Sequence, residues 1–360
     1  MNNPSTCPHF SLCSGCELPS DIDNPPIWRS AQLFFKNKGI DAELICDGFE
    51  RTRLKAKLAV DPDGKLGLFK KHTHDVIPIP DCLIHHEAIN KASSILRTEI
   101  IRQNLSIYSE KSGLGLVRYV QFFVERETDK VQLTVVVNQS KITPDLQLFC
   151  QSLLKYDLWH SIWINFHPKA SNTILGRSWE LFNGSPFLWQ TLNQTPIPFH
   201  PGAFSQVHLS LFEKMLQKIE SWVKPNEKVI ELYAGVGAIG LTLLPKTQNI
   251  TLVENNPLAH LSFQQAKKEI PYQCIDAKDA VIDDQDLIIV DPPRKGLDPL
   301  LLDKIAQLEK GRLIYVSCGF ESFQRDCDRL LGAGWKIEEA QGYLLFPGTN
   351  HVETLTLLYK

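Results

Sequence analysis

The alternation of apolar and polar positions changes character at about residue 200 of the 360-residue chain. Beyond it, apolar stretches alternate with helical ones, and the pattern predicts strands at 228–234, 249–254, 272–276, 286–291, 312–318, 336–345 and 352–359. Helical stretches separate the first five strands, which predicts a parallel sheet with helices on both faces. The last two strands predict an antiparallel pair. An amphipathic helix is expected over 209–223, ahead of the first strand.

The first half of the chain predicts a mixed α+β region. Helical spacing covers 85–105, alternating stretches at 117–125 and 131–137 predict a hairpin, and 161–166 resembles a further strand. Earlier, basic and apolar residues alternate over 51–60 and return through an Asp-Pro-Asp-Gly turn to a second strand, followed by Lys70, Lys71, His72 and His74. This basic hairpin suits contact with nucleic-acid phosphates or a solvated edge strand, and the pattern favours neither.

Composition narrows the class of protein but does not give its function. A hydrophobic content of 43% and a charged content of 22% are typical of a globular protein long enough for two domains. The net charge of −3 excludes a global nucleic-acid signature, although a local basic patch is compatible with it. We see neither a signal peptide nor an apolar run that could span a bilayer, so we expect a cytoplasmic protein. In that reducing compartment the nine cysteines should be thiols, catalysts or metal ligands rather than disulfides.

Three cysteines crowd a loop-like stretch near the N-terminus, and a fourth follows a Pro-rich turn: Cys7, Cys13, Cys16 and Cys82. Four thiolates suit a [4Fe–4S] cluster or a zinc ion. The spacing Cys-x5-Cys-x2-Cys is unusual for a zinc ribbon, which favours the cluster, and Cys46 competes for the fourth position. We therefore expect a cluster segment with the basic hairpin at 1–90, a central α+β RNA-facing domain at 91–205 that forms one unit with it, and an α/β domain at 206–360.

A glycine loop follows the first strand of the α/β domain. Gly235, Gly237 and Gly240 match G-x-G-x-x-G and lead into a helix at 239–244. Glycines let the backbone approach a ligand closely, and the helix N-terminus offers free N–H groups. NAD and S-adenosylmethionine are both candidates. Glu231 argues against a dinucleotide, whose strand is usually apolar there, whereas Glu254 at the end of the next strand suits the ribose of either cofactor.

The fourth strand ends in Asp291-Pro292-Pro293-Arg294, which favours S-adenosylmethionine. The rigid turn places a carboxylate in the crevice where open α/β sheets bind ligands. Amino-group methyltransferases carry an aromatic residue after Pro-Pro, so Arg294 argues against methylation of an adenine amine. The fifth strand delivers Cys318 to the same end of the sheet. Such a cysteine is usually structural, but its place beside the Asp-Pro-Pro strand makes it a candidate nucleophile.

A thiol beside a methyl donor suits methylation of C5 of uracil. C5 alone is a poor nucleophile, but addition of a thiolate at C6 gives an enolate whose C5 attacks the methyl group. A base must then remove the C5 proton so that elimination releases the cysteine. Glu353, at the start of the last strand, is the candidate base, and His351 lies two residues earlier.

In these motifs the sequence resembles the RNA uracil-C5 methyltransferases over nearly the whole chain. The resemblance rests on the Cys-x5-Cys-x2-Cys run with Cys82, Phe204-x-Gln206, the glycine loop, Val253-Glu254, Asp291-Pro-Pro-Arg294-x-Gly296, Val316-Ser-Cys318 and Phe346-Pro-x-Thr-x-His351-Val-Glu353. It implies a class I methyltransferase domain with a seven-stranded, mostly parallel sheet and an antiparallel end, beside an N-terminal α+β domain with an iron–sulfur cluster.

The resemblance also implies roles for individual residues. Cys318 would be the nucleophile and Glu353 the general base. S-adenosylmethionine would be bound by Gln206, Tyr233, Gly235, Gly237, Glu254, Asp276 and Asp291, with Asp276 near the adenine. A [4Fe–4S] cluster would be held by Cys7, Cys13, Cys16 and Cys82. Arg53 and Lys55 would belong to the basic segment of the RNA-facing domain.

The sequence departs from this family at several positions. Gly319 and Phe320 stand where Asn and Pro usually follow the nucleophile. Ala238 stands where an Asn often lies in the cofactor loop, and His208 replaces a frequent Asn after Phe-x-Gln-x. The nucleophile, the base and Asp-Pro-Pro remain, so we expect catalysis.

We predict a monomeric enzyme that methylates one uridine of 23S ribosomal RNA to 5-methyluridine. The chain starts almost directly at Cys7 and has no room for the RNA-binding TRAM domain of many relatives, which indicates the short ribosomal-RNA type. The same chemistry on transfer RNA is an alternative. Gly319 and Ala238 leave open a non-catalytic RNA-binding protein. An iron–sulfur oxidoreductase with NAD on the glycine loop is a third class, against which Asp291-Pro-Pro weighs.

Overall fold

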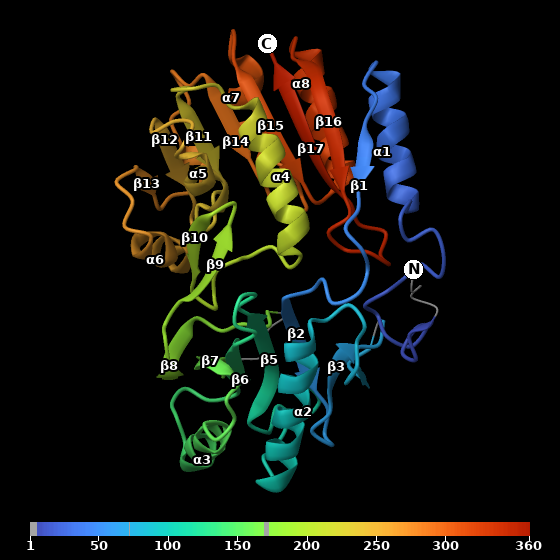
Figure 1. The fold of residues 1–360 in the computed structure, drawn as a ribbon, viewed down its shortest axis with the longest axis vertical. Coiled ribbons are helices and arrows are strands. Elements are labelled where there is room, and N and C mark those ends of the chain that lie inside the picture. Colours follow the sequence, from blue (N-terminus) through green and yellow to red (C-terminus); the bar gives the residue numbers. More distant parts are fainter. Residues whose placement is uncertain (1–5, 72, 169–172) are drawn as a thin grey trace. The chain divides into compact units, whose positions relative to one another are not determined.

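The computed structural model describes residues 6–71, 73–168 and 173–360, which form two compact units (Figure 1). The N-terminal unit comprises the described parts of Met1–Ser20 and Gly48–Gln190 together with His200–Gly202. The C-terminal unit comprises Asp21–Asp47, Thr191–Phe199 and Ala203–Lys360. Residues 21–47, which we expected within the N-terminal segment, thus group with the C-terminal unit.

An eight-stranded sheet forms the centre of the C-terminal unit, in the order β1-β16-β17-β15-β14-β11-β12-β13. Its strands are β1 (Glu43–Ile45), β11 (Val229–Leu232), β12 (Ile250–Val253), β13 (Tyr272–Gln273), β14 (Leu287–Val290), β15 (Arg312–Ser317), β16 (Lys336–Tyr343) and β17 (Glu353–Tyr359). Neighbouring strands from β11 to β15 pair in parallel, and β17 is antiparallel to β15 and β16. This confirms the predicted α/β class. The edge strand β1 was not predicted and makes the sheet eight-stranded rather than seven-stranded.

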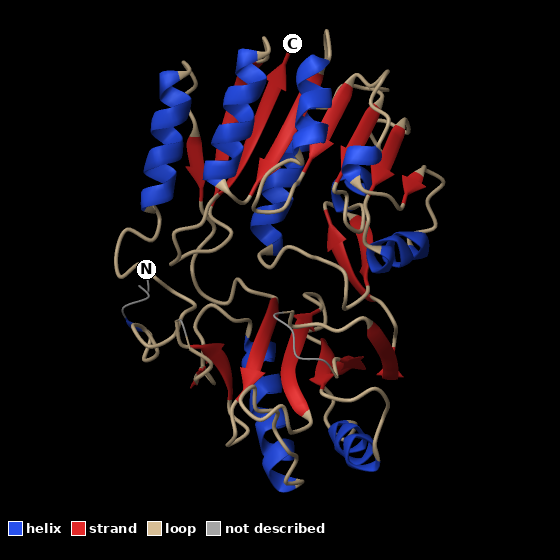
Figure 2. Ribbon diagram, turned by 180° about the vertical axis from the view of Figure 1, so that it is seen from behind, coloured by secondary structure: helices blue, strands red, loops and turns tan. Residues whose placement is uncertain are grey.

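Helices cover both faces of this sheet (Figures 1 and 2). On one face α1 (Pro26–Asn37), α7 (Pro299–Gln307) and α8 (Phe320–Gly332) share one apolar core. On the other face lie α4 (Leu209–Trp222) and α5 (Ala238–Leu243), while α6 (Pro257–Gln265) follows β12. A Cβ at Gly342 of β16 would stand 2.4 Å from the Trp28 ring of α1. This close packing explains why residues 21–47 belong to the C-terminal unit.

A seven-stranded mixed sheet forms the N-terminal unit, in the order β4-β3-β2-β5-β6-β7-β8. Its strands are β2 (Lys55–Val60), β3 (Leu66–Phe69), β4 (Val76–Pro78), β5 (Val117–Val124), β6 (Val131–Val137), β7 (Trp159–Phe166) and β8 (Ser178–Gly184). Helices α2 (Glu87–Arg102) and α3 (Pro144–Leu153) contact each other. A separate sheet pairs β9 (Leu188–Leu192) with β10 (Thr195–Phe199), and β10 belongs to the C-terminal unit. Across the described ranges, no helix has the length and apolar character needed to cross a membrane.

The basic strand of the predicted hairpin lies inside this sheet. β2 pairs with β3 and also with β5, so it is not an edge strand. The Lys55 side chain is buried, its ammonium lies 5.0 Å from the centre of the Phe123 ring, and burial lowers its pKa to about 7. The predicted solvated edge strand is therefore wrong, and burial removes Arg53 and Lys55 from an exposed basic face, whereas Lys57 of the same strand is exposed. His72 lies outside the described residues.

Candidate active site and cysteine pocket

The glycine loop joins β11 to α5 at the carboxyl edge of the parallel strands. Gly235 and Gly237 have φ values of 54° and 81°, which glycine adopts without strain. A Cβ at Gly237 would stand 2.7 Å from Cδ1 of Leu252, closer than real contacts allow. The backbone conformation of this loop therefore requires a glycine at position 237.

Glu231 lies buried in β11 beneath the loop. Its Oε2 accepts a hydrogen bond from the Gly240 N–H at 2.7 Å, which fixes the first turn of α5. Burial raises the pKa of Glu231 to about 8, and the charges of Asp291 and Glu254 act in the same direction. Glu231, whose presence in the strand spoke against a dinucleotide cofactor, thus anchors the glycine loop through this hydrogen bond.

Glu254 and Tyr272 hold Gly235 from two sides. Glu254 Oε2 accepts from the Gly235 N–H at 3.1 Å, while its Oε1 accepts from the Asn256 N–H at 2.8 Å. The Tyr272 hydroxyl donates to the Gly235 carbonyl at 2.6 Å, and its ring stacks on His260 at 4.7 Å. Sequence reasoning missed Tyr272, because a lone tyrosine in a two-residue strand carries no motif.

A pocket opens over this loop, and several of the expected cofactor residues line it: Gln206, Tyr233, Gly235 and Asp291. Tyr233 has φ 62°, uncommon for a residue with a side chain, and its hydroxyl accepts from the Asp298 N–H at 3.5 Å. Phe204 also lines the pocket and is 65% exposed. Asp276 instead caps the short helix Ala277–Asp279, where it accepts from the Lys278 N–H.

Cys318 and Glu353 belong to the same edge of the sheet because their strands are antiparallel neighbours. Ser317, the last residue of β15, pairs with Thr354 of β17. Cys318 is one residue beyond that pair on the first strand, and Glu353 is one residue before it on the second. Asp291 directly follows β14, the parallel neighbour of β15. Three adjacent strands therefore deliver a thiol and two carboxyls to the edge where open α/β sheets bind ligands.

Burial and neighbouring negative charge raise the pKa values of all three groups. Burial raises the pKa of Cys318 to about 11, and Glu353 and Asp291 add to the rise. Burial raises the pKa of Glu353 to about 8, with a further contribution from Asp291. The pKa of Asp291 rises to about 7 through burial and the charge of Glu254. No described residue donates a hydrogen bond to the buried Oε2 of Glu353. A carboxyl that titrates near neutrality without a partner is suited to proton transfer.

Arg294 supplies positive charge to both reactive candidates. Its guanidinium lowers the pKa of Cys318 and of Glu353, opposing the effect of burial. From the sequence we used Arg294 to argue against an adenine substrate and as part of the family motif, and assigned it no role in the site. Its position directly after Asp-Pro-Pro, at the edge that holds Cys318, was the signal that could have shown this electrostatic role.

One pocket of the N-terminal unit is lined by all four expected cluster ligands: Cys7, Cys13, Cys16 and Cys82. The Cys13 N–H donates to the His9 carbonyl at 2.9 Å, and Cys13 Sγ accepts from the Gly15 N–H at 3.3 Å. His9 Nε2 contacts Asp81 Oδ1, which joins this loop to the turn that carries Cys82. Cys46 packs against the core of the C-terminal unit. Within the described ranges, no three or more His, Cys, Asp or Glu side chains are arranged to hold a metal ion.

The Arg53 side chain lines the same pocket. Its backbone bonds to the stretch that follows Cys82, with the Arg53 N–H donating to the Ile84 carbonyl at 2.9 Å. Burial raises the pKa values of Cys13 and Cys82, and that of Cys16 to about 12, whereas the charge of Arg53 lowers all three. Arg53 thus acts on the cysteines rather than forming part of an exposed basic face.

Comparison with known proteins bears on the family of the chain. Residues 275–360 match the model of the tRNA (Uracil-5-)-methyltransferase family. An uncharacterized RNA methyltransferase of Protochlamydia amoebophila is 39% identical, over 99% of this chain and 97% of its own. Another, from Staphylococcus aureus, is 27% identical over 98% and 83%. The Pyrococcus abyssi tRNA (uracil-54, C5)-methyltransferase, solved with S-adenosyl-L-homocysteine, has the same fold, with a TM-score of 0.81 at 23% identity over 97% of this chain and 86% of that one.

Proposed function

The chain belongs to the RNA (uracil-5-)-methyltransferase family and is an S-adenosylmethionine-dependent enzyme, and we propose that it uses Cys318 and Glu353 to methylate one uridine of 23S ribosomal RNA at C5. One observation carries the assignment of these residues. A thiol and a buried, unpartnered carboxyl are delivered by neighbouring strands to the edge that also holds the glycine loop. Activation of C5 and removal of its proton require such a pair.

The reaction follows from the chemistry of the two groups. The Cys318 thiolate adds to C6, and the electrons of the C5–C6 double bond move into an enolate. C5 then attacks the methyl carbon of the sulfonium, the carbon–sulfur bond breaks, and S-adenosylhomocysteine leaves as the neutral product. Glu353 accepts the proton from C5. The enolate electrons re-form the double bond and expel the Cys318 thiolate, which leaves 5-methyluridine.

Positive charge beside these groups favours their reactive forms. Both Cys318 and Glu353 act when deprotonated, yet burial holds both mainly protonated at neutral pH. Arg294 lowers both pKa values. A sulfonium in the adjacent pocket carries a second positive charge and shifts both groups in the same direction. The methyl donor thereby helps to ionise the groups that use its methyl.

The cofactor is bound by the residues around the glycine loop. Gln206, Tyr233, Gly235 and Asp291 line the pocket, and Gly237 gives the loop its shape. Each Glu254 oxygen accepts one backbone hydrogen bond and keeps a lone pair for a ribose hydroxyl. Asp276 is a weaker candidate for cofactor binding, because its carboxylate already caps a short helix.

The four cysteines of the N-terminal unit would hold a [4Fe–4S] cluster. Thiolates are the ligands that such a cluster takes from a protein. The pocket fits this group, since four thiols and apolar side chains surround it and the thiolates gain the positive charge of Arg53. The ligands lie on both sides of the β2–β3 hairpin in sequence, so the cluster serves to fix that hairpin.

The RNA substrate has two candidates. The resemblance to ribosomal-RNA members of the family supports 23S RNA, and the printed names of the matching family model and of the Pyrococcus abyssi enzyme support transfer RNA. In either RNA the target uridine must leave its stack to reach Cys318. Mass-spectrometric mapping of 5-methyluridine in both RNAs, from a strain that lacks the protein, distinguishes them.

The assignment of the nucleophile is tested with Cys318→Ala. We expect this variant to bind S-adenosylmethionine with unchanged affinity and to transfer no methyl group to RNA. Cys327→Ala is the matched control, because Cys327 lies buried in α8 and packs into the core. Methyl transfer by Cys318→Ala at the rate of the unchanged protein contradicts the mechanism.

A further inference from the structure

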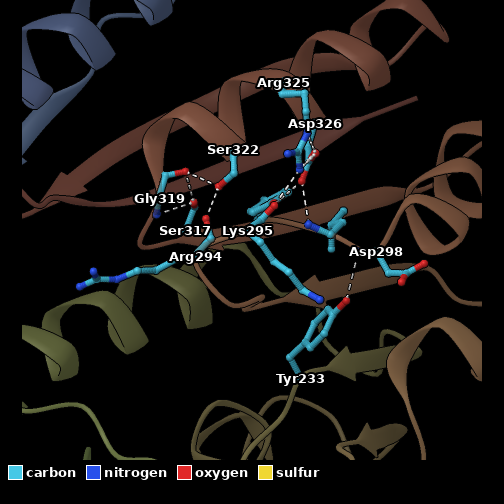
Figure 3. A network of polar contacts seen from close by, with 11 residues as sticks. Tyr233, Arg294, Lys295, Asp298, Ser317, Gly319, Ser322, Arg325 and Asp326 are labelled. Carbon is cyan, nitrogen blue, oxygen red and sulfur yellow. Dashed lines mark hydrogen bonds and ion pairs between the residues drawn. The ribbon is translucent and has the colours of Figure 1, made fainter. Parts of the chain in front are cut away.

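The first turn of α8 is hydrogen-bonded to the loop that carries Cys318 and to the loop that carries Arg294 (Figure 3). The Ser322 hydroxyl lies 2.8 Å from the Arg294 carbonyl and 2.8 Å from the Gly319 carbonyl, so its single proton is shared between them. The Ser317 hydroxyl accepts from the Gly319 N–H at 3.2 Å. The residues on both sides of Cys318 are thereby fixed to each other and, through Ser322, to the loop after Asp-Pro-Pro.

A second set of contacts holds the same loop one turn later along α8. Asp326 is fully buried, and its Oδ2 accepts from the Leu297 N–H and from the Tyr315 hydroxyl, each at 2.8 Å. Arg325 binds Oδ1 of Asp326 and donates to the Lys295 carbonyl at 2.9 Å. The backbone of residues 294–297 is therefore bonded to α8 at several successive positions.

The space at Gly319 is filled by this arrangement. A Cβ at position 319 would stand 2.6 Å from the Arg294 carbonyl oxygen and 2.8 Å from Ser322 Oγ. Since the nearer atom is backbone, a side chain could enter only if the 294 loop moved away. The glycine that departs from the family pattern after the nucleophile is thus the residue that lets the two loops touch.

We propose that these contacts form a clasp, made by Ser322 and Asp326, that positions Arg294 against Cys318 and Glu353. Ser322 and Asp326 are positioning residues in this assignment, since both bind the loop backbone. Figure 3 shows the Arg294 side chain extending away from the hydrogen-bonded network, while its carbonyl is held inside it. The inference rests on the proposed role of Cys318, and it adds how the cation beside that thiol is kept in place.

The clasp is tested by the pH profile of Cys318 alkylation. Iodoacetamide is added to the full-length protein with S-adenosylhomocysteine bound, and modification of the Cys318 peptide is followed by mass spectrometry. Arg294→Gln removes a cation that lowers the pKa of this thiol, so it should move the profile to higher pH. Ser322→Ala should move it in the same direction, with alkylation at pH 8 slowed by about threefold to tenfold, where tenfold is one pKa unit.

The decisive measurement is the double variant. If the clasp acts through Arg294, Ser322→Ala should have no further effect in the Arg294→Gln background. Ser322→Thr keeps a hydroxyl and should restore the profile. Arg329→Ala is the control, because Arg329 lies on the same helix and pairs with the half-buried Asp303. All variants are first required to bind S-adenosylhomocysteine.

Two results overturn the proposal. The first is an unchanged profile for Ser322→Ala. The second is an equal shift with and without Arg294, which would show that Ser322 acts on the thiol by another route. Neither result depends on methyl transfer, whereas Cys318→Ala tests the proposed function by methyl transfer alone. A failure of the clasp is therefore distinguishable from a failure of the proposed mechanism.

Discussion

Replacement of Glu353 by glutamine should separate methyl transfer from product release. The amide keeps the size of the side chain but cannot accept the C5 proton. Because the carboxylate raises the pKa of Cys318, its loss should leave addition to C6 no slower. A methylated covalent adduct between protein and RNA should then accumulate. Loss of a general base typically slows its step by about 10²–10⁴-fold, and we expect adduct breakdown to slow by about that factor.

The pH dependence of adduct breakdown gives an independent check on the role of Glu353. The pKa of Glu353 is raised to about 8, so its ionised form is the minor one below that pH. By the Henderson–Hasselbalch relation, about a tenth of the molecules carry the carboxylate at pH 7 and about nine tenths at pH 9. Adduct breakdown in the unchanged protein should therefore rise about tenfold across this range. Glu353→Gln should lose the rise, since the amide does not titrate.

The assay uses end-labelled RNA and S-adenosylmethionine, quenched in denaturant and resolved by electrophoresis. The adduct migrates more slowly than free RNA, so its formation and breakdown are counted separately. Glu338→Gln is the matched control, because Glu338 is an exposed residue of the adjacent strand β16. Release of methylated RNA by Glu353→Gln at the unchanged rate, or with the same rise between pH 7 and 9, would refute the assignment of the base.

Three further outcomes follow from the structure. Tyr272→Phe loses the hydrogen bond to the Gly235 carbonyl. It should weaken S-adenosylmethionine binding by about 1 kcal/mol in titration calorimetry and leave the rate at saturation unchanged. Unchanged affinity would show that Tyr272 does not contribute to the cofactor site. Gly237→Ala should lower the free energy of unfolding in urea by about 1–3 kcal/mol and abolish cofactor binding, because φ of residue 237 is 81° and a Cβ there would clash with Leu252. A variant that is as stable and still binds the cofactor would contradict the loop geometry. If the four cysteines hold the proposed cluster, Arg53→Gln should lower its reduction potential in a titration followed by electron paramagnetic resonance, by about 59 mV for each tenfold change in the equilibrium. Arg51→Gln, at an exposed ion pair with Glu87, should leave the potential unchanged, and equal shifts in the two variants would contradict the role of Arg53.

The parts of the fold visible in the sequence are those with strong local periodicity. The parallel strands of the C-terminal unit are nearly continuous apolar runs, since helices cover both faces, and all seven predicted strands are present. Strand β1 has three residues and pairs with β16, almost three hundred positions later. No local pattern encodes such a pairing. Helix α1 was missed with it, because its apolar face is explained only by the core it joins.

The site shows the same division between local and distant information. Cys318, Glu353 and Asp291 were predicted because each stands at a strand end, and parallel and antiparallel neighbours bring strand ends together. Lys55 was misjudged because an alternating basic strand does not reveal that it lies inside a sheet or that its lysine packs over the Phe123 ring. The role of Ser322 was missed for a different reason. Its hydrogen bonds reach a backbone carbonyl in another loop, and such a contact leaves no trace in residue type.

The charges around the glycine loop explain why an acidic site suits this cofactor. Glu231, Asp291 and Glu353 all have raised pKa values, and each is raised in part by a neighbouring carboxyl. These three carboxyls are therefore only partly ionised near neutral pH when no cation is bound beside them. A sulfonium favours the ionised forms, whereas the neutral sulfur of S-adenosylhomocysteine does not. By linkage, the site holds the methyl donor more tightly than the spent product as pH rises through about 7 to 8, the range in which these carboxyls ionise. The same repulsion that suits Glu353 to the proposed role of a base near neutrality thus favours product exchange.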